Sequence, residues 1–97
     1  MKVVYKNQRL EKVLTIPNKL VSKYGNYSKT IYSRFILLKE ADGIEDLQKL
    51  KFLNLKFVED PESEHWILPI NDQLSFKFKY IFSENKNEKT LMIINLN

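Results

Sequence analysis

The spacing of apolar residues changes once along this chain, and that change constrains the fold more than any other feature. Before residue 42, apolar residues recur at helical intervals in the stretch NYSKTIYSRFILLKEA, at Tyr27, Ile31, Phe35 and Leu38. This stripe predicts a helix that buries one side, which Tyr32 and Ile36 widen. After residue 51 the spacing becomes two: in NDQLSFKFKY every second residue from Leu74 to Tyr80 is apolar. Such alternation indicates half-buried strands.

Turn and cap residues divide the chain into expected elements. Pro17 suits the first turn of a helix and Gly25 its end, so residues 7–24 form two short helices or one kinked helix. Asp42 and Glu45 have capping-box spacing, which predicts another short helix over 43–50. The remaining elements are strands, expected at residues 1–5, 51–57, 66–70, 71–80 and 90–96. Pro69 indicates an edge or a bulge in its strand.

This order predicts an α+β fold, with the N-terminal strand and the helices packed on one face of a mostly antiparallel sheet. Consecutive strands with short connections are expected to pair as a meander. A length of 97 residues predicts one domain. The longest apolar runs, FILL and LMII, are far too short to span a membrane, and the absence of cysteine fits a reducing cytoplasm.

Charged residues give the main indications of function. The formal net charge is +4, and the 16 Lys and Arg residues are interpreted as spread along the chain rather than clustered. Lys77 and Lys79 share one strand face, with Lys56 on a neighbouring strand, and three ammonium groups there would attract phosphate. The alternative is that they keep an exposed sheet face soluble. Trp66, Tyr80 and the phenylalanines are interpreted as core residues, although aromatic rings also stack on bases.

A histidine and an acidic loop precede the second half of the sheet. His65 is the only histidine, and it is either a general acid or base or a loop residue beside Trp66. The loop carries four carboxylates between residues 59 and 64 and lacks the spacing and glycine of an EF-hand. It is interpreted as solvated, and no metal or cofactor is expected.

Several stretches resemble the RelE/ParE superfamily of bacterial toxins, and most of all its HigB-like, plasmid-maintenance killer branch. They are YKNQRLEKVLT, VSKYG, SRFILLKEADGIEDLQKL, HWILPINDQLSFKFKY and TLMIINLN. The resemblance implies a RelE-like fold and a type II toxin that cuts messenger RNA on the ribosome. It also implies a helix-turn-helix antitoxin as partner, with RNA or the ribosome as target, and no membrane.

The same comparison predicts a degenerate catalytic set. Relatives have a basic loop where this chain has residues 59–65, an arginine where it has Ser75, or Leu74 in a register shifted by one, and an Asp-Tyr-His tail that Leu96 and Asn97 do not supply. The expected function is a toxin or toxin-like protein with weak or no cleavage. The alternatives are a non-catalytic protein-binding or inhibitor module, and a simple RNA-binding protein. Any catalysis is assigned to Lys56, His65, Lys77 and Lys79, and binding of RNA or a partner to Lys51, Lys56, Lys77 and Lys79.

Overall fold

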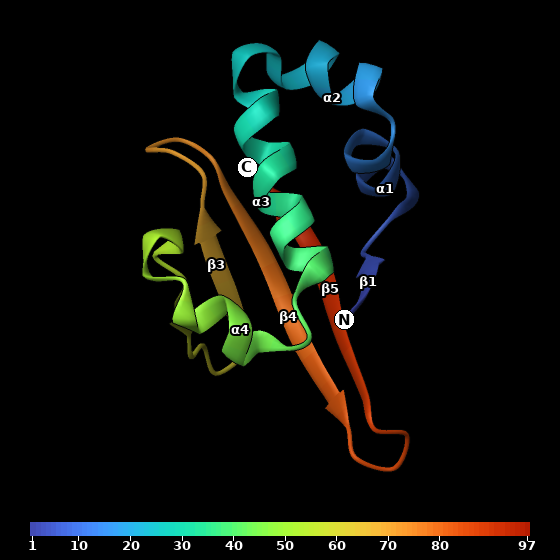
Figure 1. Cartoon of the computed structure of the whole chain (residues 1–97), viewed down its shortest axis with the longest axis vertical. Helices are drawn as coiled ribbons and strands as arrows, with labels where there is room; N and C mark the ends of the chain where they lie inside the picture. Colours follow the sequence, from blue (N-terminus) through green and yellow to red (C-terminus); the bar gives the residue numbers. More distant parts are fainter.

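A five-stranded sheet and four α-helices make up the structure, a computed structural model that describes residues 1–97 (Figure 1). In chain order the elements are β1 (Lys2–Tyr5), α1 (Gln8–Thr15), α2 (Pro17–Tyr24), the 3₁₀ turn η1 (Gly25–Tyr27), α3 (Ser28–Glu40), α4 (Ile44–Lys49), the 3₁₀ turn η2 (Lys51–Leu53), β2 (Lys56–Val58), β3 (His65–Pro69), β4 (Ser75–Ser83) and β5 (Glu88–Leu96). The predicted order of one strand, then helices, then four strands is confirmed.

The ends of α1 and α2 follow from cap residues in the sequence. The Asn7 side chain accepts a hydrogen bond from the Leu10 N–H at 2.9 Å, which satisfies a free donor in the first turn of α1. Pro17 occupies the first turn of α2, where its missing N–H costs nothing. Gly25 ends α2 with φ = 55°, a backbone conformation that side chains disfavour. The chain therefore forms two short helices rather than one kinked helix.

The start of α4 differs from the predicted capping box. Gly43, not Asp42, is the N-cap, and a glycine has no side chain with which to cap the helix. The carboxylate that bends back belongs to Asp46, which accepts a hydrogen bond from the Asp42 N–H at 3.0 Å. Because the cap lies one residue later than expected, the third helical position is Asp46 rather than Glu45, and its carboxylate bonds to the residue before the N-cap, which is not the predicted capping box.

The strand order in the sheet is β1-β5-β4-β3-β2. Strands β2 to β5 form an antiparallel meander, and β1 pairs with β5 in parallel, so the sheet is mostly antiparallel as predicted. Lys77 pairs with Asn95 whereas Phe78 pairs with Ile93, which leaves Ile94 as an extra, bulged residue of β5. The bulge shifts the alternation by one residue, so that Ile93 and Leu96 are both buried.

The strand predicted over residues 51–57 is mostly wrong. Residues 51–53 form η2, and Asn54 has φ = 53°, a left-handed conformation that interrupts an extended chain. Only Lys56–Val58 pairs with β3. The burial of Leu53 and the 58% exposure of Phe52 match the alternation of a strand, so the pattern alone could not distinguish a strand from this turn. Pro69, in contrast, lies at the end of β3 beyond the reach of β2, which confirms the predicted local edge.

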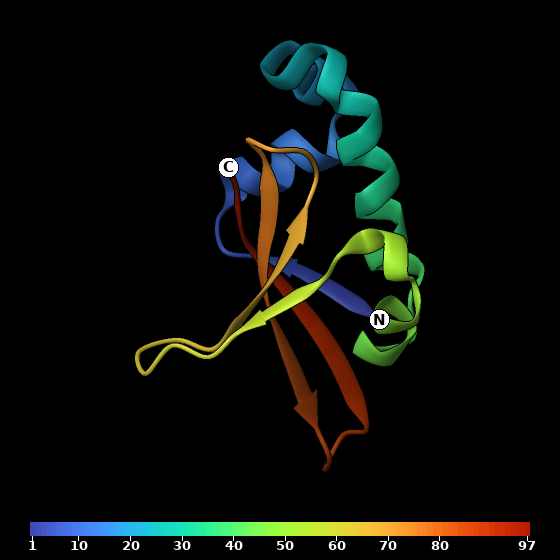
Figure 2. The same ribbon diagram turned by 90° about the vertical axis from the view of Figure 1, so that its left-hand side faces the viewer.

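Helices α3 and α4 cover one face of the sheet, and the α1–α2 hairpin packs at one end of it (Figures 1 and 2). Ile31, Phe35 and Leu38 of α3 are at most 2% exposed and share one core with Phe76 and Phe78 of β4. Complete burial of one such side chain contributes roughly 1.5–3 kcal/mol. Tyr27 and Tyr32 are about half exposed. The predicted stripe is therefore narrower than expected and contains neither tyrosine.

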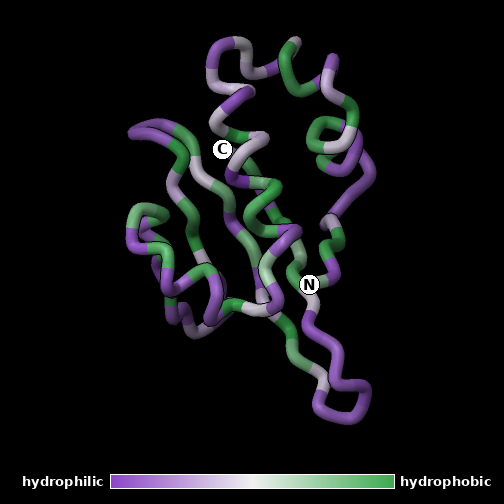
Figure 3. Tube along the Cα trace, in the orientation of Figure 1, coloured by the Kyte–Doolittle hydropathy of each residue, from purple (hydrophilic) through white to green (hydrophobic).

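The face of β3 and β4 that points away from α3 carries no helix (Figure 2). Polar residues concentrate at the connections, as in the hydrophilic tip between β4 and β5, while apolar segments lie in the helices and strands (Figure 3). None of the helices combines the length and the apolar character needed to cross a membrane. The helix-free side of the sheet, called the open face below, is where the predicted lysines lie.

Candidate functional site

The open face carries lysines in two rows that run across the strands. Lys56 of β2 pairs with Ile67 of β3, which pairs with Lys77 of β4. Paired residues project from the same side of a sheet, so Lys56 and Lys77 share the open face about 10 Å apart, two strand spacings of roughly 4.8 Å each. The neighbouring row contains Lys79, which pairs with Met92 of β5. The placement of all three predicted lysines on one face is confirmed.

A shallow depression of about 260 Å³ lies among these lysines. Met92 and Ile94 supply its apolar lining, and Lys6, Lys77 and Lys79 supply three ammonium groups. Lys6 reaches this position because its N–H donates to the Ile93 carbonyl at 2.9 Å, which extends the pairing of β1 with β5 by one residue. No local pattern in the sequence indicated a role for Lys6, because it follows a strand whose partner is more than 80 residues away. We call this depression the lysine pocket.

His65 begins β3 and is only 7% exposed. Its Nδ1 lies 3.0 Å from the Ser63 carbonyl oxygen, so an Nδ1–H donates to that oxygen and Nε2 is left without the proton in the neutral ring. Ser63 also lines the lysine pocket, so the backbone carbonyl that His65 contacts belongs to a residue of the pocket wall. The ring itself is not among the groups that line the pocket. The burial of the ring disfavours an exposed acid or base, and the predicted loop position is wrong, because His65 is the first residue of β3.

The acidic loop between β2 and β3 extends away from α3 on the side of the open face (Figure 2). Its backbone is shaped by Asp60, whose carboxylate accepts from the Glu62 N–H and whose carbonyl accepts from the Ser63 N–H, both at 3.0 Å. No group of three or more His, Asp or Glu side chains is placed to hold a metal ion. The loop therefore contributes negative charge beside the lysine pocket and no evident ligand site.

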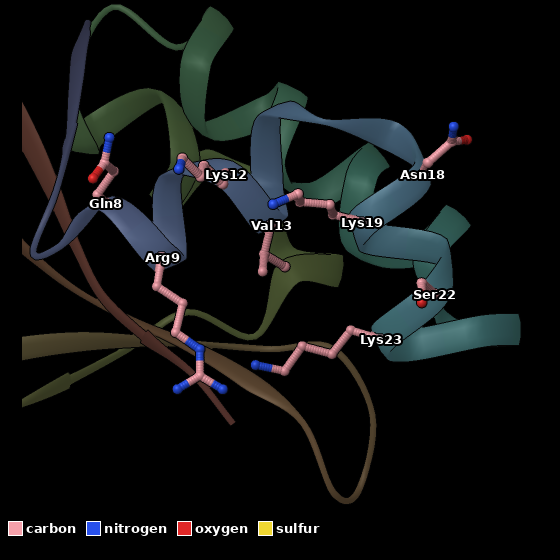
Figure 4. A pocket seen from close by; sticks show the side chains of 8 residues that line it. All are labelled: Gln8, Arg9, Lys12, Val13, Asn18, Lys19, Ser22 and Lys23. Atoms are coloured by element: carbon pink, nitrogen blue, oxygen red, sulfur yellow. The ribbon is translucent and has the colours of Figure 1, made fainter.

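A second basic depression, which the sequence analysis missed, lies between α1 and α2 (Figure 4). It has a volume of about 830 Å³ and contains four cations and one apolar side chain, its lining being Gln8, Arg9, Lys12, Val13, Asn18, Lys19, Ser22 and Lys23. In Figure 4, Arg9 of α1 and Lys23 of α2 extend toward the same space below Val13, and Lys19 extends toward α1. We call this depression the interhelical cleft.

The charge distribution shows why the cleft was missed. Residues 1–41 contain nine Lys and Arg residues against two acidic residues, whereas residues 42–97 contain seven against ten. The interpretation of an even spread is therefore wrong, and the contrast between the two segments is the signal that could have revealed the cleft. The only ion pair in the structure joins Lys2 to Glu88, so the cations of the cleft and the lysine pocket have no carboxylate partner.

The other predicted site residues lie apart from the lysine pocket. Lys51 belongs to η2 and lines neither the pocket nor the cleft. Ser75 begins β4 two residues before Lys77 and therefore shares the open face with it. An arginine at position 75 would extend the basic row toward the end of the strand. The structure therefore brings together Lys77 and Lys79, places Lys56 two strands away, and separates Lys51.

No protein-family model, curated protein or solved structure matches the chain. The structure defines an α+β domain with two basic surfaces. One is the helix-free face of the sheet and the other is the N-terminal helix pair, and the cations of both form no ion pairs.

Proposed function

We propose that this chain is a toxin-like protein of the RelE/ParE kind that binds RNA through the open face and has weak or no nuclease activity. One observation carries the proposal: Lys6, Lys77 and Lys79 line a single pocket, and no carboxylate partner neutralises them. Ammonium groups held in this way pair with phosphate oxygens and make binding dependent on salt. The strand-helix-sheet order gives further support, because it is the order that the resemblance implies.

The proposal of weak cleavage follows from the chemistry of RNA hydrolysis. Cleavage needs a base for the 2′-hydroxyl proton, cations for the developing negative charge and an acid for the leaving oxygen. Lysines supply the cations, but His65 is nearly buried and its Nδ1 faces a carbonyl oxygen. The acidic loop also repels phosphate. Any residual cleavage would depend first on Lys56, Lys77, Lys79 and His65.

The proposal includes a helix-turn-helix antitoxin as partner and a cytoplasmic location. An antitoxin that neutralises the protein would cover the lysine pocket and compete with RNA for it. A second candidate is a non-catalytic protein-binding module. The observation in its favour is the exposure of large apolar side chains at the β2 edge, where Phe52 is 58% and Phe57 47% exposed, because aromatic residues are enriched in protein interfaces.

The test is binding of a labelled single-stranded RNA by the wild type and by K77E/K79E at two salt concentrations. Substitution of half-exposed strand residues should change stability by only about 0.5 kcal/mol each. We expect binding to the double variant to fall by at least about tenfold, and wild-type binding to weaken as salt rises. K29E/K86E, which makes the same charge change at exposed positions away from the pocket, is the matched control.

Two results would contradict the proposal. Equal binding by the wild type and K77E/K79E would mean that the lysines are only a solvated face. Rapid messenger cleavage on stalled ribosomes after induction would contradict the weak nuclease, and H65A and K79A would then identify the chemistry. If the wild type bound no RNA, and if K77E/K79E lost a protein partner that the wild type retained, the second candidate would be favoured.

A further inference from the structure

The lysine pocket and the interhelical cleft are joined by a third depression of about 230 Å³ at the end of β5. This connecting depression shares Arg9, Val13 and Lys23 with the cleft and Ile94 with the lysine pocket. The shared lining residues place the three depressions next to one another around the end of β5. Ile94, the bulged residue of β5, lines both the lysine pocket and the connecting depression, and we call this position the Ile94 junction.

Seven different cations lie along this surface and no acidic side chain does. They are Lys6, Arg9, Lys12, Lys19, Lys23, Lys77 and Lys79. Glu11, the only acid of the helix pair, lines a separate depression beside β1. None of the seven forms an ion pair, so the path presents cations without direct carboxylate partners, and the acidic loop opposes them only beside the lysine pocket.

Tyr24 fixes the helix pair against the end of the sheet. Its hydroxyl donates to the Leu96 carbonyl at 3.0 Å, and both residues line the connecting depression. Burial raises the pKa of the Tyr24 hydroxyl, and the nearby Arg9 opposes part of that rise. The phenol is therefore neutral at physiological pH and holds the helical part of the path in register with the strand part.

We infer that these three depressions form one track for the phosphate backbone of a single polynucleotide strand, which runs from the lysine pocket across the end of β5 into the interhelical cleft. The inference rests on the proposed function, because it extends the RNA site of the open face. It assigns the cleft cations a direct part in affinity, which neither the sequence nor the resemblance gave them. The recognition is of charge and backbone rather than of base sequence.

The composition of the cleft favours a polynucleotide over a protein partner. The central part of a protein interface is apolar and depleted in lysine, whereas the cleft has Val13 as its only apolar lining residue and three lysines. Its neutral polar residues are amides and a hydroxyl, Gln8, Asn18 and Ser22, which donate hydrogen bonds to phosphate oxygens. A strand that enters the cleft thus finds cations and donors and no acidic side chain.

The experiment compares K12Q/K19Q/K23Q with wild type on fluorescent oligouridines of about 4 and about 16 nucleotides, lengths that bracket the usual sites on single strands. We expect the triple variant to lose about tenfold or more in affinity for the long RNA and little for the short one, which the lysine pocket holds alone. The slope of log affinity against log salt should fall by about 2, from three lost contacts at about 0.7 each. K29Q/K49Q/K86Q removes the same charge elsewhere and should behave as wild type.

Several outcomes would overturn the track. An equal loss in the control triple variant would reduce the effect to net charge, and an unchanged affinity of K12Q/K19Q/K23Q for the long RNA would remove the cleft from the site. In both cases K77E/K79E still decides the proposed function by itself. Tighter binding of poly-glutamate than of the long RNA, lost in K12Q/K19Q/K23Q, would assign the cleft to an acidic protein. Single-stranded DNA and duplex DNA of equal length show whether the backbone must be RNA.

Discussion

Replacement of Phe35 by alanine should destabilise the protein by about 4 kcal/mol. Phe35 is 2% exposed at the centre of the α3 stripe, and Phe-to-Ala changes in cores cost about 3–5 kcal/mol. Two contacts of the ring add to the simple loss of burial. The Tyr5 ring lies 6.4 Å away between centroids, a pair that contributes about 0.5–1.5 kcal/mol. The Lys39 ammonium lies 5.4 Å from the ring, worth about 0.5–1 kcal/mol.

The loss should be measured by urea unfolding, followed through the fluorescence of Trp66, the only tryptophan. A domain of this size has a free energy of unfolding of about 5–15 kcal/mol, so the F35A variant should unfold at a visibly lower urea concentration. Tyr32→Ala is the matched control, because it also removes an aromatic ring from α3 but at a position that is 48% exposed. We expect Y32A to change the free energy of unfolding by less than about 1 kcal/mol.

Similar losses in the two variants would refute the reasoning. If F35A cost less than about 1 kcal/mol with an unchanged dependence on urea, the ring could not be packed as described. If Y32A cost as much as F35A, α3 would present a different side to the sheet. Either result would also remove the argument that the helix layer covers only one face and leaves the open face accessible.

Two further substitutions test the helix ends and the joint between helices and sheet. Tyr24→Phe removes the hydrogen bond to Leu96 and should cost about 1 kcal/mol at neutral pH. Folding raises the pKa of Tyr24, so the stability that its protonated hydroxyl contributes is present below about pH 10 and is lost as pH rises through the folded pKa. Y24F should therefore lose less stability than the wild type in alkali. Unfolding curves from about pH 9 to 11 measure this difference. Asp46→Ala should cost about 1 kcal/mol through its bond to Asp42, while Glu45→Ala should change the thermal midpoint little; equal effects would contradict the shifted register.

The sequence was sufficient for elements whose pattern is local. Pro17, Gly25 and the alternation through Phe76 and Phe78 predicted the helix breaks and the longest strands, since caps and period are written in neighbouring residues. It failed at residues 51–57, where Leu53 alternates with its neighbours as a strand residue would but is buried from a 3₁₀ turn. Alternation over so few residues does not distinguish a strand from a turn that tertiary contacts hold in place.

The candidate site divides in the same way. Lys77 and Lys79 could be placed on one face because a strand alternates, and Lys56 followed once the meander was expected. Lys6 and the interhelical cleft could not be placed, because their positions depend on which distant strand β1 joins and on how α2 folds back against α1. The positive charge of the helix surface could nevertheless be predicted from the contrast in charge between residues 1–41 and 42–97.

The position of β5 between β1 and β4 sets the order in which the protein can become complete during synthesis. β1 leaves the ribosome before the other strands of the sheet, yet its only strand neighbour is β5, about 90 residues later. Closing so long a loop costs conformational entropy before any pairing repays it. A nascent chain that ends before residue 88 therefore has neither the sheet that spans both sides of β5 nor the Ile94 junction. The full basic track can form only after β5 has been synthesised.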